Sequence, residues 1–120
     1  MDKATLIRRI SDAYAVDPDY PWASTPEAAV FRHPNNRKWF ALWMRVANAH
    51  LGLPGDGARD VLNVKCDPVL IGSLRGQPGY LPAYHMNKSQ WLTLVMDVLP
   101  DDDIMALVAM SFALTRPKRR

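Results

Sequence analysis

The residues best suited to binding chemistry lie between Gly79 and Trp91, in the run Gly-Tyr-Leu-Pro-Ala-Tyr-His-Met-Asn-Lys-Ser-Gln-Trp. This segment combines three aromatic rings with an imidazole, an amide and an ammonium group, and it has neither helical nor strand periodicity. A proline in its middle also opposes a regular element. We therefore predict a shaped loop that enters a strand at Trp91, and loops of this kind commonly carry binding surfaces.

Several residues in and around this loop form a candidate nucleic-acid site. They are Lys65, His85, Asn87, Lys88 and Trp91, joined by Arg37 and Lys38 near a predicted hairpin turn. Lysine and asparagine suit contacts with phosphates or base edges, and a tryptophan can stack on an unpaired base. The alternative is structural: His85 and Asn87 would bind backbone groups and keep the loop rigid, as polar loop residues often do.

The net charge of +3 depends strongly on the C-terminus. The last five residues, Arg-Pro-Lys-Arg-Arg at 116–120, carry four of the fifteen basic groups. Without them the remaining chain has eleven basic and twelve acidic residues, a balance of −1. The tail attracts any polyanion, so binding by the folded body requires that its basic groups cluster on one face.

The sequence offers little for catalysis, and we expect a protein that is not an enzyme. Cys66 and His85 resemble a nucleophile and base, but Cys66 ends an apolar run where a buried, inert thiol is usual. The three histidines lack the spacing of zinc ligands, so we expect no metal and no cofactor. The acidic residues 101–103 fit the N-terminus of a helix better than a cation site.

The order of expected elements is typical of an α+β domain. We predict helices over 4–14, from Asp67 to Gly76 and from Pro100 onward, where Asp2 and Asp67 are natural N-caps. Period-two or apolar runs predict strands over 28–33, 38–46, 61–66 and 91–98, with a further short strand within 81–85. In the second strand Trp39, Ala41 and Trp43 are expected to share one face.

At 120 residues the chain is expected to form one domain over 1–115, followed by the basic tail 116–120. No apolar run is long enough for a membrane span, and the first residues lack a signal-peptide core. A single cysteine suits a reducing compartment. These features predict a cytoplasmic location and no membrane partner.

Four segments together resemble the MmcQ/YjbR family of small bacterial proteins, which are commonly labelled DNA-binding. They are Ala-Val-Phe-Arg-His at 29–33 with Lys-Trp-Phe-Ala-Leu at 38–42, Asn-Val-Lys-Cys-Asp-Pro at 63–68, Tyr-His-Met-Asn-Lys at 84–88 with Trp91, and Ser-Phe-Ala-Leu at 111–114. The chain departs from the family at Gln90, where histidine is frequent, and at Phe112 and Ala113, where the family commonly has tyrosine and aspartate.

This resemblance implies a fold like that of secretion chaperones, α-β(3)-α-β(1-2)-α, in which helices pack against an antiparallel sheet. It also implies weak DNA binding that is largely independent of sequence. The alternative is a protein-interaction or chaperone-like module that uses its sheet face, either as a homodimer or with another protein. Tryptophans 39, 43 and 91 would then supply the kind of anchors that are enriched at interfaces.

Overall fold

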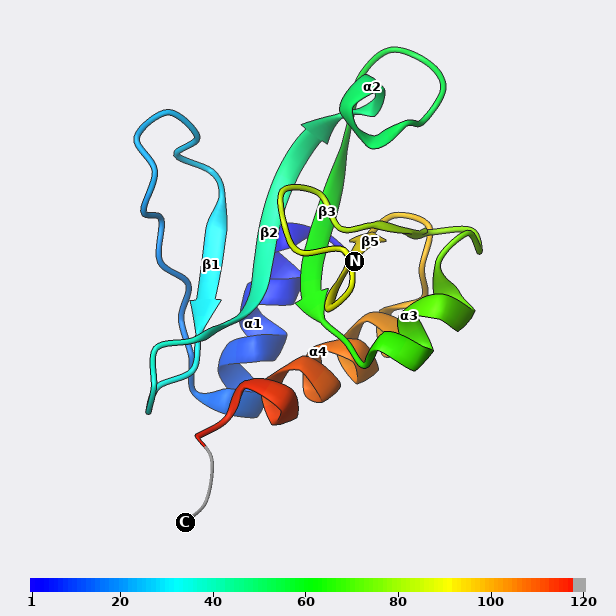
Figure 1. Ribbon diagram of the computed structural model, residues 1–120. Coiled ribbons are helices and arrows are strands. Elements are labelled where there is room, and N and C mark those ends of the chain that lie inside the picture. Colours follow the sequence, from blue (N-terminus) through cyan, green and yellow to red (C-terminus); the bar gives the residue numbers. More distant parts are fainter. Residues whose placement is uncertain (118–120) are drawn as a thin grey trace.

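Helices and strands alternate along the computed structural model, which describes residues 1–117 (Figure 1). Their order is α1 (Lys3–Tyr14), β1 (Ala29–Arg32), β2 (Trp39–Ala47), α2 (Asn48–Leu51), β3 (Ala58–Lys65), α3 (Pro68–Leu74), β4 (Tyr80–Pro82), β5 (Trp91–Val95) and α4 (Asp101–Thr115). The predicted α+β class is confirmed. The short α2 lies between two expected strands, where no element is predicted, and residues 118–120 of the predicted tail lie outside the described residues.

The helix starts follow from local chemistry. The Asp2 carboxylate accepts a hydrogen bond from the Thr5 amide at 2.8 Å, so it caps α1 as expected. Asp67 accepts from the Val69 amide at 2.9 Å, and Pro68 occupies the first position of α3. Three aspartates fill the first turn of α4, where negative charge complements the helix dipole. The sequence therefore specifies where each of these helices begins.

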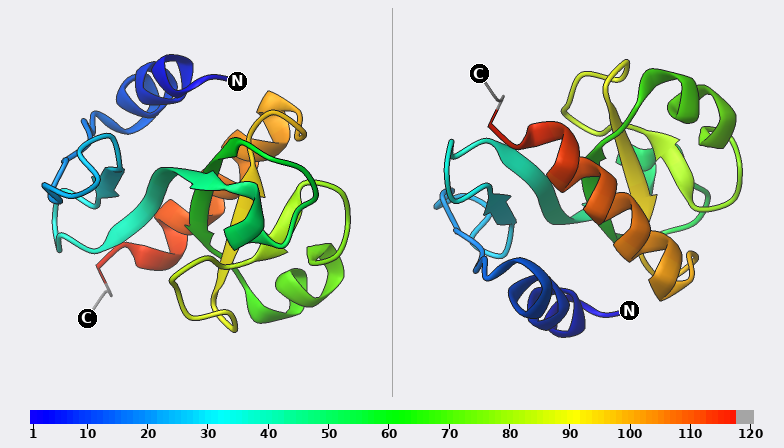
Figure 2. Two further views of the ribbon diagram at one scale, coloured as in Figure 1. Left: turned by 90° about the horizontal axis from the view of Figure 1, so that it is seen from above. Right: turned by 90° about the horizontal axis from the view of Figure 1, so that it is seen from below.

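The five strands form one sheet in the order β1-β2-β3-β5-β4, and every neighbouring pair is antiparallel. Helices α1 and α4 lie together on one face of this sheet (Figure 2). Their apolar residues, among them Leu6, Ile10 and Ile104, are fully buried with Phe31 and Leu62 of the sheet in the main core. The opposite face is therefore left for loops to cover.

A β-bulge changes which side chains of β2 face the helices. The register passes from Phe31 opposite Ala41 to Arg32 opposite Trp39, which leaves Phe40 as the extra residue. Phe40 is consequently fully buried in the helix-side core with Ala41 and Trp43. Trp39 instead lies on the loop side, so the expectation that it shares a face with Ala41 and Trp43 is wrong. Strict alternation cannot reveal a bulge.

Candidate nucleic-acid interface

The loop between β4 and β5 is fastened to the sheet through a buried polar network. The Asn63 amide of β3 donates to the Tyr84 carbonyl at 2.8 Å, and the Tyr84 amide donates to the Thr93 hydroxyl of β5 at 2.9 Å. Thr93 in turn donates to the Asn63 side-chain oxygen at 2.5 Å. Both side chains are fully buried. The loop therefore crosses the face of the sheet that the long helices leave open (Figure 1).

The residues expected to fasten the loop have more local roles. The Asn87 side-chain oxygen accepts from the amide and hydroxyl of Ser89, at 2.9 and 2.7 Å, in an exposed turn. Among residues 1–117, the His85 side chain has no hydrogen-bond partner, and its ring packs against Tyr84 with centroids 3.9 Å apart. His85 has a left-handed φ of +59°, a conformation that the anchored backbone at Tyr84 helps to hold. Asn87 shapes the turn, whereas Asn63 and Thr93 anchor the loop.

Three basic residues lie on the chain segments that meet near Trp91, at the end of the loop. Lys65 and Trp91 are directly opposite each other in the β3–β5 pair. The Arg75 guanidinium, just after α3, donates to the Lys88 carbonyl at 3.4 Å, while the Cys66 amide donates to the Gln90 carbonyl. We call Lys65, Arg75, Lys88 and Trp91 the basic corner.

The cations of the basic corner are not neutralised by neighbouring carboxylates. Within residues 1–117, none of Lys65, Arg75 and Lys88 forms an ion pair. The acid nearest in sequence, Asp67, uses its side chain to cap α3. Arg75 and Lys88 are exposed and Lys65 is half-buried. These positive charges are therefore available to an anion, which electrostatics would attract from solution.

The other two predicted basic residues lie elsewhere, at the β1–β2 turn. Arg37 has a left-handed φ of +63° and forms an ion pair of 3.2 Å with Asp19, which also binds Arg32 at 2.7 Å. Lys38 is exposed beside it. The neighbouring Asn36 amide donates to the Thr115 carbonyl at the end of α4. Arg37 and Lys38 thus accompany the start of the basic tail, and Arg37 is already paired.

A groove lies on the side of the sheet that the anchored loop crosses, and the loop bounds it. Its volume is about 550 Å³. Leu42, Met44 and Val46 of β2 form its floor. The walls and rim are contributed by the segment 22–28, by the start of β2, by α2 and by the loop. Their side chains are those of Trp22, Ser24, Thr25, Glu27, Trp39, His50, Tyr84, His85 and Met86. We call this feature the sheet-face groove. It is an apolar and aromatic hollow.

Cys66 and His85 do not form a catalytic pair. The Cys66 thiol is buried on the helix side, 3.9 Å from the Met110 sulfur, and its burial raises the pKa of the thiol. His85 instead lines the groove. Across residues 1–117 no group of three or more acidic, histidine or cysteine side chains is placed to hold a metal ion. No helix in that range is both long and apolar enough to cross a bilayer.

An antiparallel five-stranded sheet covered on one side by two helices, with a structured loop on the other, defines the class of small α+β domain to which this chain belongs. The family model described as YjbR matches residues 11–114. The chain is therefore a member of the YjbR family, as its sequence segments predict.

Relatives extend over almost the whole chain. The uncharacterized protein YyaQ of Bacillus subtilis is 38% identical over 117 residues, which cover 97% of this chain and 99% of YyaQ. A crystal structure from Pseudomonas syringae is 43% identical with a TM-score of 0.94, covering 97% of this chain and 100% of that one. A Deinococcus radiodurans protein with a DUF419 domain is 23% identical with a TM-score of 0.71. The match covers 98% of this chain and 81% of the Deinococcus chain, and the two proteins share the fold.

Sequence reasoning missed Arg75 and the anchoring pair Asn63 and Thr93. Arg75 gave no signal because it falls inside the helix expected from Asp67 to Gly76, whereas α3 ends at Leu74, and its contact with Lys88 spans 13 residues. Polar residues at 63 and 93 within apolar strands were an available signal, since buried polar groups require partners.

Proposed function

We propose that this protein binds DNA weakly, without catalysis and largely without sequence preference, through the basic corner. The observation that carries this proposal is that three cations, on the segments that meet at Trp91, have no carboxylate partner within residues 1–117. Lysine and arginine bind phosphates as charges and as hydrogen-bond donors, and such contacts carry little sequence information. A location in the cytoplasm, where a bacterium keeps its DNA, is part of the proposal.

We propose a revised membership for the predicted site. Lys65, Lys88 and Trp91 remain its centre and Arg75 joins them, while Asn87 shapes the turn that presents Lys88. Arg37 and Lys38 belong with the C-terminal tail, because they lie beside the end of α4. We therefore expect two separable contributions to DNA affinity, one from the folded body and one from the tail.

The deciding experiment is a DNA titration, by fluorescence anisotropy, of the full chain and of a version ending at Thr115. Each is measured with and without Lys65→Ala and Lys88→Ala. Arg8→Ala with Arg9→Ala on α1 is the control, because it removes the same charge from the other side of the sheet.

We expect the shortened chain to bind DNA in the micromolar range or more weakly, with affinity that fades as salt rises. The lysine changes should then weaken binding much more than the α1 control. Loss of all binding on truncation, with no effect of the lysine changes in the full chain, would show that only the tail holds DNA.

The sheet-face groove supports a second candidate, a protein-interaction module that acts as a homodimer or on another protein. Its apolar floor and its tryptophans are typical of interface centres. Molecular mass measured by light scattering over a range of concentrations tests the homodimer. A mass that rises with concentration in the parent but not in Met44→Glu would favour self-association through the groove.

A further inference from the structure

We propose that the sheet-face groove holds a nucleobase of a single strand whose phosphates contact the basic corner. This inference rests on the proposed DNA binding and adds the form of nucleic acid that the protein prefers. It follows from the shape of the groove, its aromatic walls and its position across the loop from the cations.

The walls present aromatic rings on two sides. Trp22 and Trp39 pack edge to face with centroids 5.6 Å apart at 81°. On the other side the rings of His50 and Tyr84 are nearly parallel, with centroids 6.5 Å apart at 8°, and His85 packs on Tyr84. Proteins that bind single strands use such rings as stacking surfaces, because every base has an aromatic face. The rings are therefore suited to a planar heterocycle.

The floor and the size of the groove also fit a base. Leu42 and Val46 are almost fully buried and Met44 is partly exposed, so the floor is apolar. The volume of about 550 Å³ lies within the range of small-ligand sites, roughly 300–1,000 Å³. A base is uncharged near neutral pH, so its ring can enter such a hollow with its polar edge toward solvent at a lower cost than a phosphate, which would lose the hydration of a full charge. In a duplex the bases are stacked inside, and entry would require one to flip out.

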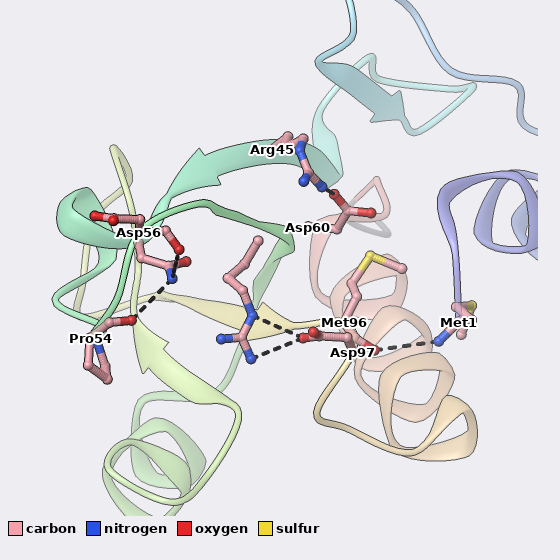
Figure 3. A network of polar contacts seen from close by, with 9 residues as sticks. Met1, Arg45, Pro54, Asp56, Asp60, Met96 and Asp97 are labelled. Carbon is pink, nitrogen blue, oxygen red and sulfur yellow. Dashed lines mark hydrogen bonds and ion pairs between the residues drawn. The ribbon is translucent and has the colours of Figure 1, made fainter.

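Net positive charge lies at the basic corner and not in the groove, which matches a nucleotide, whose phosphate is charged and whose base is neutral. At the groove, Arg45 is paired with Asp60 at 2.8 Å (Figure 3), and the exposed Glu27 adds negative charge at the rim. The cations that have no ion pair within the described residues 1–117 lie instead at the basic corner, where Lys88 is three residues beyond His85 on the anchored loop. A strand crossing this loop can therefore place a base on one side and phosphates on the other.

The experiment compares two probes on the full chain: a thymidine octanucleotide and an abasic strand with the same number of phosphates. Methionine methyl groups are labelled for NMR, since Met44 and Met86 line the groove whereas Met96, Met105 and Met110 belong to the helix-side core. We expect the thymidine strand to shift the Met44 and Met86 signals only. The abasic strand should bind about tenfold more weakly and leave both signals in place.

A pair of variants isolates the aromatic contribution. Trp22→Leu should weaken binding of the thymidine strand about tenfold and leave the abasic strand unaffected. Tyr20→Leu is the matched control, because Tyr20 is an exposed aromatic residue two positions before Trp22 and does not line the groove.

The outcomes separate the two proposals. Equal binding of both strands, with Met44 and Met86 unshifted, would overturn the base site and leave phosphate binding at the basic corner intact. Failure of both strands to bind would remove the proposed function, and this inference with it.

Discussion

Removing the buried anchor of the loop should destabilise the protein strongly. In Asn63→Ala the Tyr84 carbonyl loses its donor, and the fully buried Thr93 hydroxyl loses its acceptor. An unsatisfied buried polar group costs about 1–3 kcal/mol, so two such groups and the cavity left by the amide should cost about 3 kcal/mol. That is a large fraction of the stability of a typical domain, about 5–15 kcal/mol.

Thr93→Val probes the same network with almost no change of shape. It leaves the Tyr84 amide without an acceptor and the Asn63 oxygen without a donor, and we expect a loss of about 2 kcal/mol. Because the two residues share partners, the double variant should lose about 1 kcal/mol less than the sum of the single losses.

Urea unfolding followed by circular dichroism gives these free energies directly. Asn35→Ala is the matched control, because Asn35 is exposed and should change stability by no more than about 0.5 kcal/mol. If Asn63→Ala and Thr93→Val both unfolded within about 0.5 kcal/mol of the parent, the network would not be the anchor of the loop.

Three further predictions concern single positions. Burial lowers the pKa of His33 below its usual 6.5, and its ring nitrogens have no partner within residues 1–117. As pH drops, the unfolded chain therefore takes up a proton at His33 before the folded chain does. The urea midpoint should fall between about pH 7.5 and 5.5, and it should fall less in His33→Phe. Gly79→Ala should lose about 2 kcal/mol of unfolding free energy, because φ is +87° and the new Cβ would lie 2.6 Å from the Leu99 Cδ2 atom; an unchanged melting temperature would contradict this. Asn87→Ala should cost at most about 1 kcal/mol in urea unfolding, because its bonds to Ser89 are exposed.

The sequence predicts those features that depend on neighbours in the chain. Asp2 and Asp67 cap helices through amides two or three residues away, so their role can be read from local spacing. The bulge at Phe40 cannot be read in this way, because it depends on how β2 pairs with β1. Period-two reading therefore placed Trp39 on the wrong face, and with it hid one wall of the groove.

In the candidate site, too, features that depend on neighbours in the chain can be predicted, whereas those that depend on distant segments cannot. The loop from Tyr84 to Lys88 stands out by composition, and Lys65 with Trp91 could be placed near it from the expected strands. The groove also depends on where the segment 22–28 runs relative to the sheet. An aromatic ring in such a segment can pack into the core or line a groove, and Trp22 packs against Trp39 over the sheet face. Nothing in its local sequence distinguishes the two arrangements.

The most direct test of DNA binding by the folded body is the salt dependence of affinity in the chain ending at Thr115. Each phosphate contact to a single strand adds about −0.7 to the slope of log K against log salt. Lys65→Ala with Lys88→Ala should therefore make the slope less negative by about 1.4, whereas Arg8→Ala with Arg9→Ala should leave it close to that of the parent. An equal slope in all three proteins would contradict the claim that the basic corner holds phosphate.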